Sequence, residues 1–162
     1  MFREMRRNKQ ILEESRTIQI LQNGTAGVLA LLGDEDYPYA VPLSYVYEDN
    51  KIYFHGAKSG HKIDAIRQHD KASFCVIEKD DIVPEEYTTY FRSAIAFGKI
   101  RILEDEAEVR NAVTLLAEKY YPDDGEDNRI KVIDNAWDRL CMMELKIEHI
   151  TGKEAIELVR SK

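Results

Sequence analysis

Cysteine is scarce in this sequence. The 162 residues contain only Cys75 and Cys141. Two cysteines are too few for a disulfide framework, and both lie in apolar stretches where a buried free thiol is the usual state. The cysteine content therefore predicts a reducing compartment, and we expect a cytoplasmic protein.

Long apolar runs are also missing. The longest strongly apolar run, AGVLALL at 26–32, is far shorter than the ~20 residues that a membrane helix needs. The first ten residues, MFREMRRNKQ, include basic side chains but no apolar core follows them, as it would in a secretory signal. The sequence therefore predicts a protein that is neither exported nor inserted in a membrane.

Positive charge is in deficit. Lysine and arginine number 23 against 30 acidic residues, which gives a formal net charge of -7. Affinity for nucleic acid comes mainly from lysines and arginines that neutralise phosphates, so we expect no nucleic-acid partner. With 44% apolar and 33% charged residues, the composition is that of a globular protein, and the length predicts a single domain over 1–162.

Several catalytic and metal-binding motifs are absent. The four histidines, at 55, 61, 69 and 149, are scattered, and no HExxH or ligand-spaced cysteine pair is present. We therefore expect no metal site. No GxSxG occurs either, so a serine hydrolase is not expected.

Periodicity predicts six strands, at 26–32, 39–47, 51–55, 71–79, 88–103 and 141–152. The first three should form an antiparallel meander, and Gly98 should mark a bulge in the fifth. The fold class that we expect is mainly β with α: a six-stranded antiparallel barrel with peripheral helices.

Helical periodicity is confined to four segments. A helix near 13–24 is expected, with Ser15 as its N-cap and Gly24 as its end. Further helices are expected at 61–68, 104–120 and around 130–137. The single domain would thus begin with a helical segment at 1–24 and carry a helical insertion at 104–137 before its last strand.

The segment KIYFHGAKSGHK, at 51–62, places a glycine-rich basic loop between a strand and a helix. It is not a Walker motif, because its spacing and the residues after Lys62 are wrong. Free backbone amides and the helix dipole would still favour an anion there. Ser59 could cap the helix and bond a phosphate oxygen, while Lys58 and Lys62 could supply charge-assisted contacts. A solvated turn with surface lysines explains the segment equally well.

The stretch YPYAVPLSYVYEDNKIYFHGAKSGHKIDAIRQHDKASFCV, followed by YFRSAIAFGKIRIL, resembles the pyridoxamine 5′-phosphate oxidase-like flavoproteins. It is most similar to their nitroimidazole-resistance branch. The resemblance implies an FMN-binding split barrel, and it is carried mainly by residues 25–103. A dianionic phosphate attached to a flat apolar ring suits a basic glycine loop beside an apolar strand.

The resemblance implies flavin contacts on two strands and one loop. On the second strand the residues that would contact the isoalloxazine ring, largely through backbone groups and apolar edges, are Val41, Pro42, Leu43 and Ser44. At the end of the third strand they are His55 and Gly56, with Ala57 beginning the phosphate loop. The basic pair of the oxidases falls on His61 and Lys62, preceded by Lys58 and Ser59.

The same resemblance implies a homodimer with FMN at the subunit interface. A polar contact from the second subunit falls on Arg92 or Ser93. The aromatic residues of EEYTTYFRSAIAFG also favour an interface, because tyrosine and phenylalanine are enriched at buried contact centres.

Two function classes are compatible with the resemblance. One is an FMN-dependent reductase of a small aromatic or nitroaromatic acceptor, with His55 as the catalytic residue. The other is a flavin-binding or sensing protein without turnover. Vitamin-forming oxidase activity is not expected, because Ile150 stands where those oxidases have a tryptophan and their C-terminal Arg, His, Asp, Arg cluster is missing.

Overall fold

The computed structural model describes residues 1–162 and consists mainly of long strands. The strands are β1 (Ala26–Leu32), β2 (Pro38–Ser44), β3 (Val46–Glu48), β4 (Lys51–Gly56), β5 (Lys71–Val83), β6 (Thr88–Ile102) and β7 (Cys141–Glu154). The helices are α1 (Glu14–Asn23), α2 (His61–Gln68), α3 (Glu106–Tyr120), α4 (Glu126–Ala136) and α5 (Ile156–Arg160). The short 3-10 turns are Asn8–Gln10, Asp34–Asp36, Pro84–Glu86 and Trp137–Arg139.

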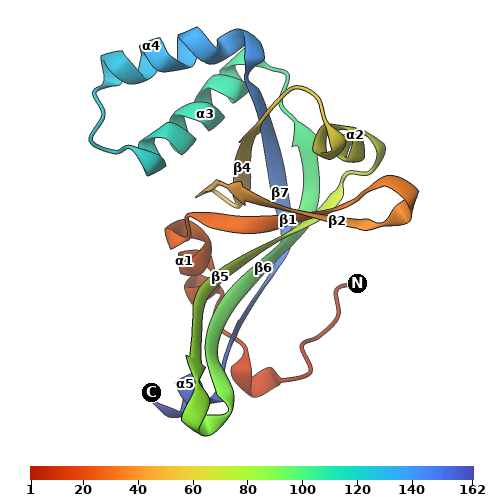
Figure 1. Cartoon of the computed structure of the whole chain (residues 1–162), viewed down its shortest axis with the longest axis vertical. Helices are drawn as coiled ribbons and strands as arrows, with labels where there is room; N and C mark the ends of the chain where they lie inside the picture. The colour runs from red at the N-terminus through yellow and green to blue at the C-terminus, as the bar shows by residue number, and fades with distance from the viewer.

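All strands belong to one antiparallel sheet with the order β2-β1-β5-β6-β7-β4-β3. The sheet is strongly twisted, and α3 and α4 form a layer at one end of it (Figure 1). The expected class, mainly β with peripheral helices, is confirmed. The sheet has seven strands rather than six, and it is not closed, because no ladder joins its edge strands β2 and β3.

The extra strand arises at Tyr45, where the expected strand at 39–47 divides into β2 and β3. The backbone of Tyr45 is bonded to side chains of α3 instead of a neighbouring strand: its N–H donates to the Tyr120 hydroxyl at 3.0 Å, and its carbonyl accepts from Lys119 Nζ at 3.0 Å. β2 then pairs with β1, and β3 pairs with β4. The expected three-stranded meander is therefore wrong, since β2 and β3 lie at opposite ends of the strand order.

Two apolar clusters hold the sheet and helices together. The main core lies on one side of the sheet and includes Phe54 and Phe74, whose ring centroids are 4.9 Å apart. A smaller cluster lies under α3 and includes Tyr53 and Met142. Because successive side chains of a strand point to opposite faces, β4 serves both clusters, with Phe54 on one side and Tyr53 on the other.

The helix and bulge expectations are confirmed in part. α1 begins after Glu13 and Ser15 lies inside it, so Ser15 is not its N-cap. α3 begins two residues later than expected, because the Asp105 side chain caps it by accepting from the Glu108 N–H at 3.0 Å. The bulge expected at Gly98 is present as a register shift between β6 and β7.

The hairpin of β5 and β6 runs past the rest of the sheet toward α5 and the C-terminus (Figure 1). Two of its apolar side chains are open to solvent, Ile82 at 73% exposure and Tyr87 at 99%. None of the five helices combines the length and the apolar character needed to cross a membrane.

Candidate functional site

The loop between β4 and α2 leaves backbone donors free at the start of a helix. Gly60 is the N-cap residue of α2, with a φ of 126°, and no side chain caps the helix. Ser59 is therefore not the cap that the sequence predicted. The first N–H groups of a helix have no partner within it, so those of α2 point toward the loop unpaired. Such a helix start favours an anion.

Cationic side chains gather at this loop. Lys62 lies against Gly56, where a Cβ would come within 3.3 Å of its Nζ. Burial raises the pKa of the nearby Cys141 thiol, and the positive charges of Lys62, Arg67 and Lys58 oppose that rise. Both lysines expected at the loop are therefore close enough to act on the same group as Arg67. Arg67 was missed, because its position in the last turn of α2 carried no loop signal.

His55 lies at the exposed end of β4, beside the same lysine. Partial burial and the charge of Lys62 lower the pKa of His55 below its ordinary 6.5. The imidazole is therefore neutral at neutral pH. It can accept a proton at one ring nitrogen and donate one from the other.

His61 points toward β2 and the turn that precedes it. Its ring stacks on Tyr39 of β2 with centroids 4.1 Å apart and planes 28° apart. Its Nε2 accepts from the Asp34 N–H at 3.2 Å. With that nitrogen occupied, His61 connects the start of α2 to β2 and β1. Tyr39 and Asp34 were missed by the sequence analysis, because nothing local predicts that they meet residue 61.

The second strand presents alternate side chains to two sides. Val41 and Leu43 pack against the main core, while Pro42 and Ser44 are exposed. A ligand on the exposed side of β2 would therefore meet the side chains of Pro42 and Ser44, and only the backbone of Val41 and Leu43. Ala57 is also exposed at the loop beyond β4.

The exposed side of β2 continues across four more strands. One row of paired residues runs from β2 to β7 and consists of Pro42, Val28, Cys75, Ile95 and Thr151. Ser93 lies on the same side, because it is two residues from Ile95 on β6. We call this side, opposite the main core, the outward face. Of the two alternatives on β6, Ser93 therefore shares a face with Pro42 and Ser44.

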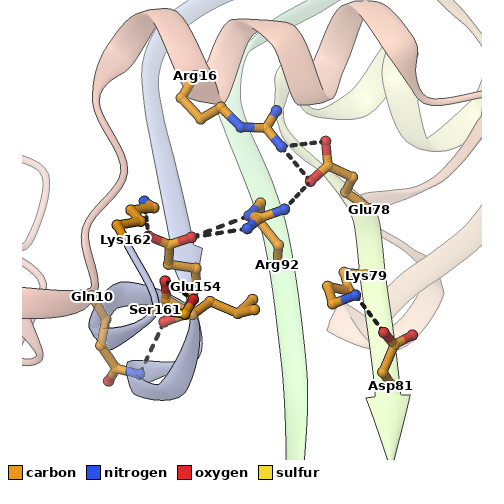
Figure 2. Close-up of polar contacts among 10 residues, drawn as sticks. Gln10, Arg16, Glu78, Lys79, Asp81, Arg92, Glu154, Ser161 and Lys162 are labelled. Carbon is orange, nitrogen blue, oxygen red and sulfur yellow. Dashed lines mark hydrogen bonds and ion pairs between the residues drawn. The ribbon is translucent and has the colours of Figure 1, made fainter.

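Arg92 belongs to the other side of β6 and is engaged in ion pairs. It lies between Glu78 of β5, at 3.0 Å, and Glu154 of β7, at 3.2 Å (Figure 2). Arg16 of α1 also binds Glu78, through both carboxylate oxygens, and Lys162 binds Glu154. The Glu154 side chain is only 2% exposed. In a single chain, the guanidinium of Arg92 on β6 thus links β5 and β7.

Three solved structures share this fold at low sequence identity. A candidate 5-nitroimidazole antibiotic resistance protein from Bacteroides thetaiotaomicron VPI-5482 has 21% identity and a TM-score of 0.72, over 89% of this chain and 86% of its own. The conserved hypothetical protein Rv2991 from Mycobacterium tuberculosis has 14% identity and a TM-score of 0.80, over 93% and 90%. The FAD and heme binding protein from Mycobacterium smegmatis has 18% identity and a TM-score of 0.70, over 94% and 80%.

Sequence comparison extends over most of the chain. No sequence among curated proteins matches it. The family described as pyridoxamine 5′-phosphate oxidase matches residues 13–154, which include every strand of the sheet. This chain therefore belongs to the pyridoxamine 5′-phosphate oxidase family.

Proposed function

We propose that this protein binds FMN at the surface formed by β2, the end of β4 and the start of α2. The observation that carries the proposal is the stack of His61 on Tyr39, with centroids 4.1 Å apart. It fixes the helix start that would hold a phosphate against β2, on the side of the strand that carries Tyr39, Val41 and Leu43, while Pro42 and Ser44 on the other side would face the flat ring. FMN requires both surfaces within reach of the short chain that joins its phosphate to its ring.

The phosphate end of the proposed site has three kinds of donor. The free N–H groups of α2 point to it, and Lys58 and Lys62 supply charge. The ring end is the exposed side of β2 at Pro42 and Ser44. One solved structure that shares the fold is described as a FAD and heme binding protein. FMN rather than FAD remains part of the proposal.

We infer a homodimer in which the outward faces of two chains meet. This face exposes apolar side chains, with Val28 at 39% and Ile77 at 64% exposure. Contiguous apolar surface of this kind is typical of an interaction site. Ser93 on that face would then reach the flavin held by the partner, as the family resemblance implies. The two unpaired cysteines, Cys75 and Cys141, favour a cytoplasmic location.

The reaction that we propose is the reduction of a small aromatic or nitroaromatic acceptor. FMN, when bound, supplies the two-electron carrier between a nicotinamide donor and that acceptor. The chain itself would bind the phosphate, orient the ring along β2 and hold a proton at the neutral imidazole of His55. The fold shared with the candidate nitroimidazole resistance protein supports this choice of acceptor.

The test begins with the purified protein and the chromophore extracted from it. Mass spectrometry should identify FMN, and a purified chain that holds FAD or binds neither flavin would overturn the cofactor assignment. NADH or NADPH should then bleach the yellow absorbance without oxygen, and a nitroimidazole should restore it. A bound flavin that neither nicotinamide reduces would favour the non-catalytic flavin-binding or sensing role.

A further inference from the structure

Tyr45 connects the two edge strands of the open sheet along the chain. It is the single residue between β2, one edge strand, and β3, the other. Its side chain is buried and donates from its hydroxyl to the Leu21 carbonyl of α1 at 2.6 Å. The backbone of Tyr45 must therefore find partners outside the sheet, because buried peptide groups without hydrogen bonds are costly.

Two neighbouring side chains at the end of α3 supply those partners. The Tyr120 hydroxyl accepts from the Tyr45 N–H at 3.0 Å and donates to the Thr25 carbonyl. Lys119 Nζ donates to the carbonyls of Tyr45 and Gly24, and lies 4.0 Å from the centroid of the Tyr45 ring. We call Lys119 and Tyr120 together the α3 clasp. It binds the end of β2 and the residues that precede β1 at the same time.

The ammonium of Lys119 contacts backbone carbonyls and aromatic rings and has no acidic partner. No carboxylate lies within ion-pair distance of its Nζ; the titratable groups that face it are the phenols of Tyr45 and Tyr120. Burial lowers the pKa of Lys119 to about 8, so the ammonium is still charged at neutral pH. Its bonds to the two carbonyls are thus charge-assisted, and these are stronger than bonds between neutral groups.

We propose that Lys119 and Tyr120 are positioning residues for the flavin ring, through their hold on the backbone that follows Pro42 and Ser44. The proposal rests on the FMN site described above. β2 is an edge strand, so only β1 pairs with it, and its last residue, Ser44, adjoins Tyr45. Without the clasp, the backbone at this end of β2 would keep hydrogen bonds to β1 alone. The ring contacts would then be made by a strand that can shift.

The clasp acts on the ring end of the site and not on the phosphate end. Its loss should therefore weaken FMN and riboflavin by the same factor, since both carry the ring. Lys119→Met removes the donors while keeping an unbranched chain, and we expect about a tenfold loss for each flavin at pH 7. Tyr120→Phe should act in the same direction. Lys119→Arg retains charged donors and should recover most of the affinity.

Fluorescence titration of both flavins against each variant tests the proposal, with Lys131→Met as the control. Lys131 is exposed on α4, so its replacement removes the same charge away from the sheet. Unchanged affinities in a folded Lys119→Met protein, or a loss restricted to FMN, would overturn the proposal. If Lys119→Met loses affinity, the proposal would also be overturned by an equal loss in Lys119→Arg or by native affinity in Tyr120→Phe.

Hydrogen exchange gives a second readout that needs no flavin. Amides of 38–46 should exchange faster in Lys119→Met and Tyr120→Phe than in the native protein, while those of β5 and β6 keep their protection. If the native protein binds neither flavin, the FMN proposal and the positioning role both fail, although faster exchange would still establish the clasp. If it binds flavin and exchange at 38–46 is unaltered, only the positioning role fails.

Discussion

The imidazole of His61 stacks on the phenol ring of Tyr39, with ring centroids 4.1 Å apart. This contact joins the first residue of α2 to the start of the edge strand β2, and the Nε2 of the same imidazole accepts from the Asp34 N–H. The His61 imidazole thus points toward β2 and Asp34 rather than toward the phosphate loop. His61 therefore connects the helix start of the proposed site to β2.

His61→Phe distinguishes a stacking role of His61 from a direct contact with the phosphate. If His61 acts through stacking, the phenylalanine ring keeps the contact and FMN affinity stays near its native value. His61→Ala removes a contact worth about 1 kcal/mol and should weaken FMN roughly fivefold. Calorimetric titration with FMN and riboflavin checks this. A loss in His61→Phe for FMN alone would instead show a direct phosphate contact, as the family resemblance implies.

Lys62→Ala should weaken FMN and spare riboflavin. A charge-assisted contact to phosphate is worth about 1.5 to 3 kcal/mol, which corresponds to roughly tenfold to a hundredfold in affinity. Riboflavin has the ring without the phosphate, so it loses nothing. Lys131→Ala on α4 serves as the control for the removed charge. Equal losses for both flavins would mean that Lys62 supports the fold, and no loss would make the loop a solvated turn.

His55 should titrate below its ordinary pKa, because partial burial and Lys62 both disfavour its charged form. Between that lowered pKa and 6.5 the unfolded chain binds more protons than the folded one. His55 therefore contributes stability that is present above pH 6.5 and is lost as the pH falls through this window. Proton NMR titration should measure the pKa of the His55 imidazole, and Lys62→Ala should raise that pKa. An unchanged pKa in that variant would contradict the assignment.

Arg92→Met should destabilise the fold, because it leaves the Glu154 carboxylate buried without its main partner. Removing one member of a buried ion pair costs about 3 kcal/mol. Arg110→Met is the control, since its partner Asp134 is 53% exposed and such a surface pair contributes about 0 to 1 kcal/mol. Urea unfolding measures both. Equal stability losses would contradict the structural role, and a drop in flavin affinity without a stability loss would place Arg92 at the flavin.

Val28→Glu should separate the proposed dimer. Val28 lies in the central row of the outward face, paired with Pro42 and Cys75, so an added carboxylate would be buried against a second chain. Sedimentation should give twice the 18.8 kDa chain mass for the native protein and a single chain mass for the variant. Val132→Glu, on α4 at 56% exposure, should leave the mass unchanged. A native monomer that retains FMN would refute the shared site.

The local signals in the sequence determined most of the secondary structure. β1, β5 and β7 begin where the alternating pattern begins, and the bulge falls at Gly98. The glycine loop at 56–60 also lies between a strand and a helix as expected. These features depend on side-chain period and backbone freedom over a few residues, so a short window of sequence contains all the information.

The tertiary structure alone decided where the sheet opens and which polar groups are free. The alternating pattern continues through Tyr45, and the break is imposed by Tyr120, 75 residues away. The sequence alone suggests that Arg92 is free to bind a ligand, but the structure pairs it with Glu154, 62 residues away. Buried backbone and charged groups must be paired, but the sequence does not say with which distant residue. That choice is made when the sheet folds and brings the partners together.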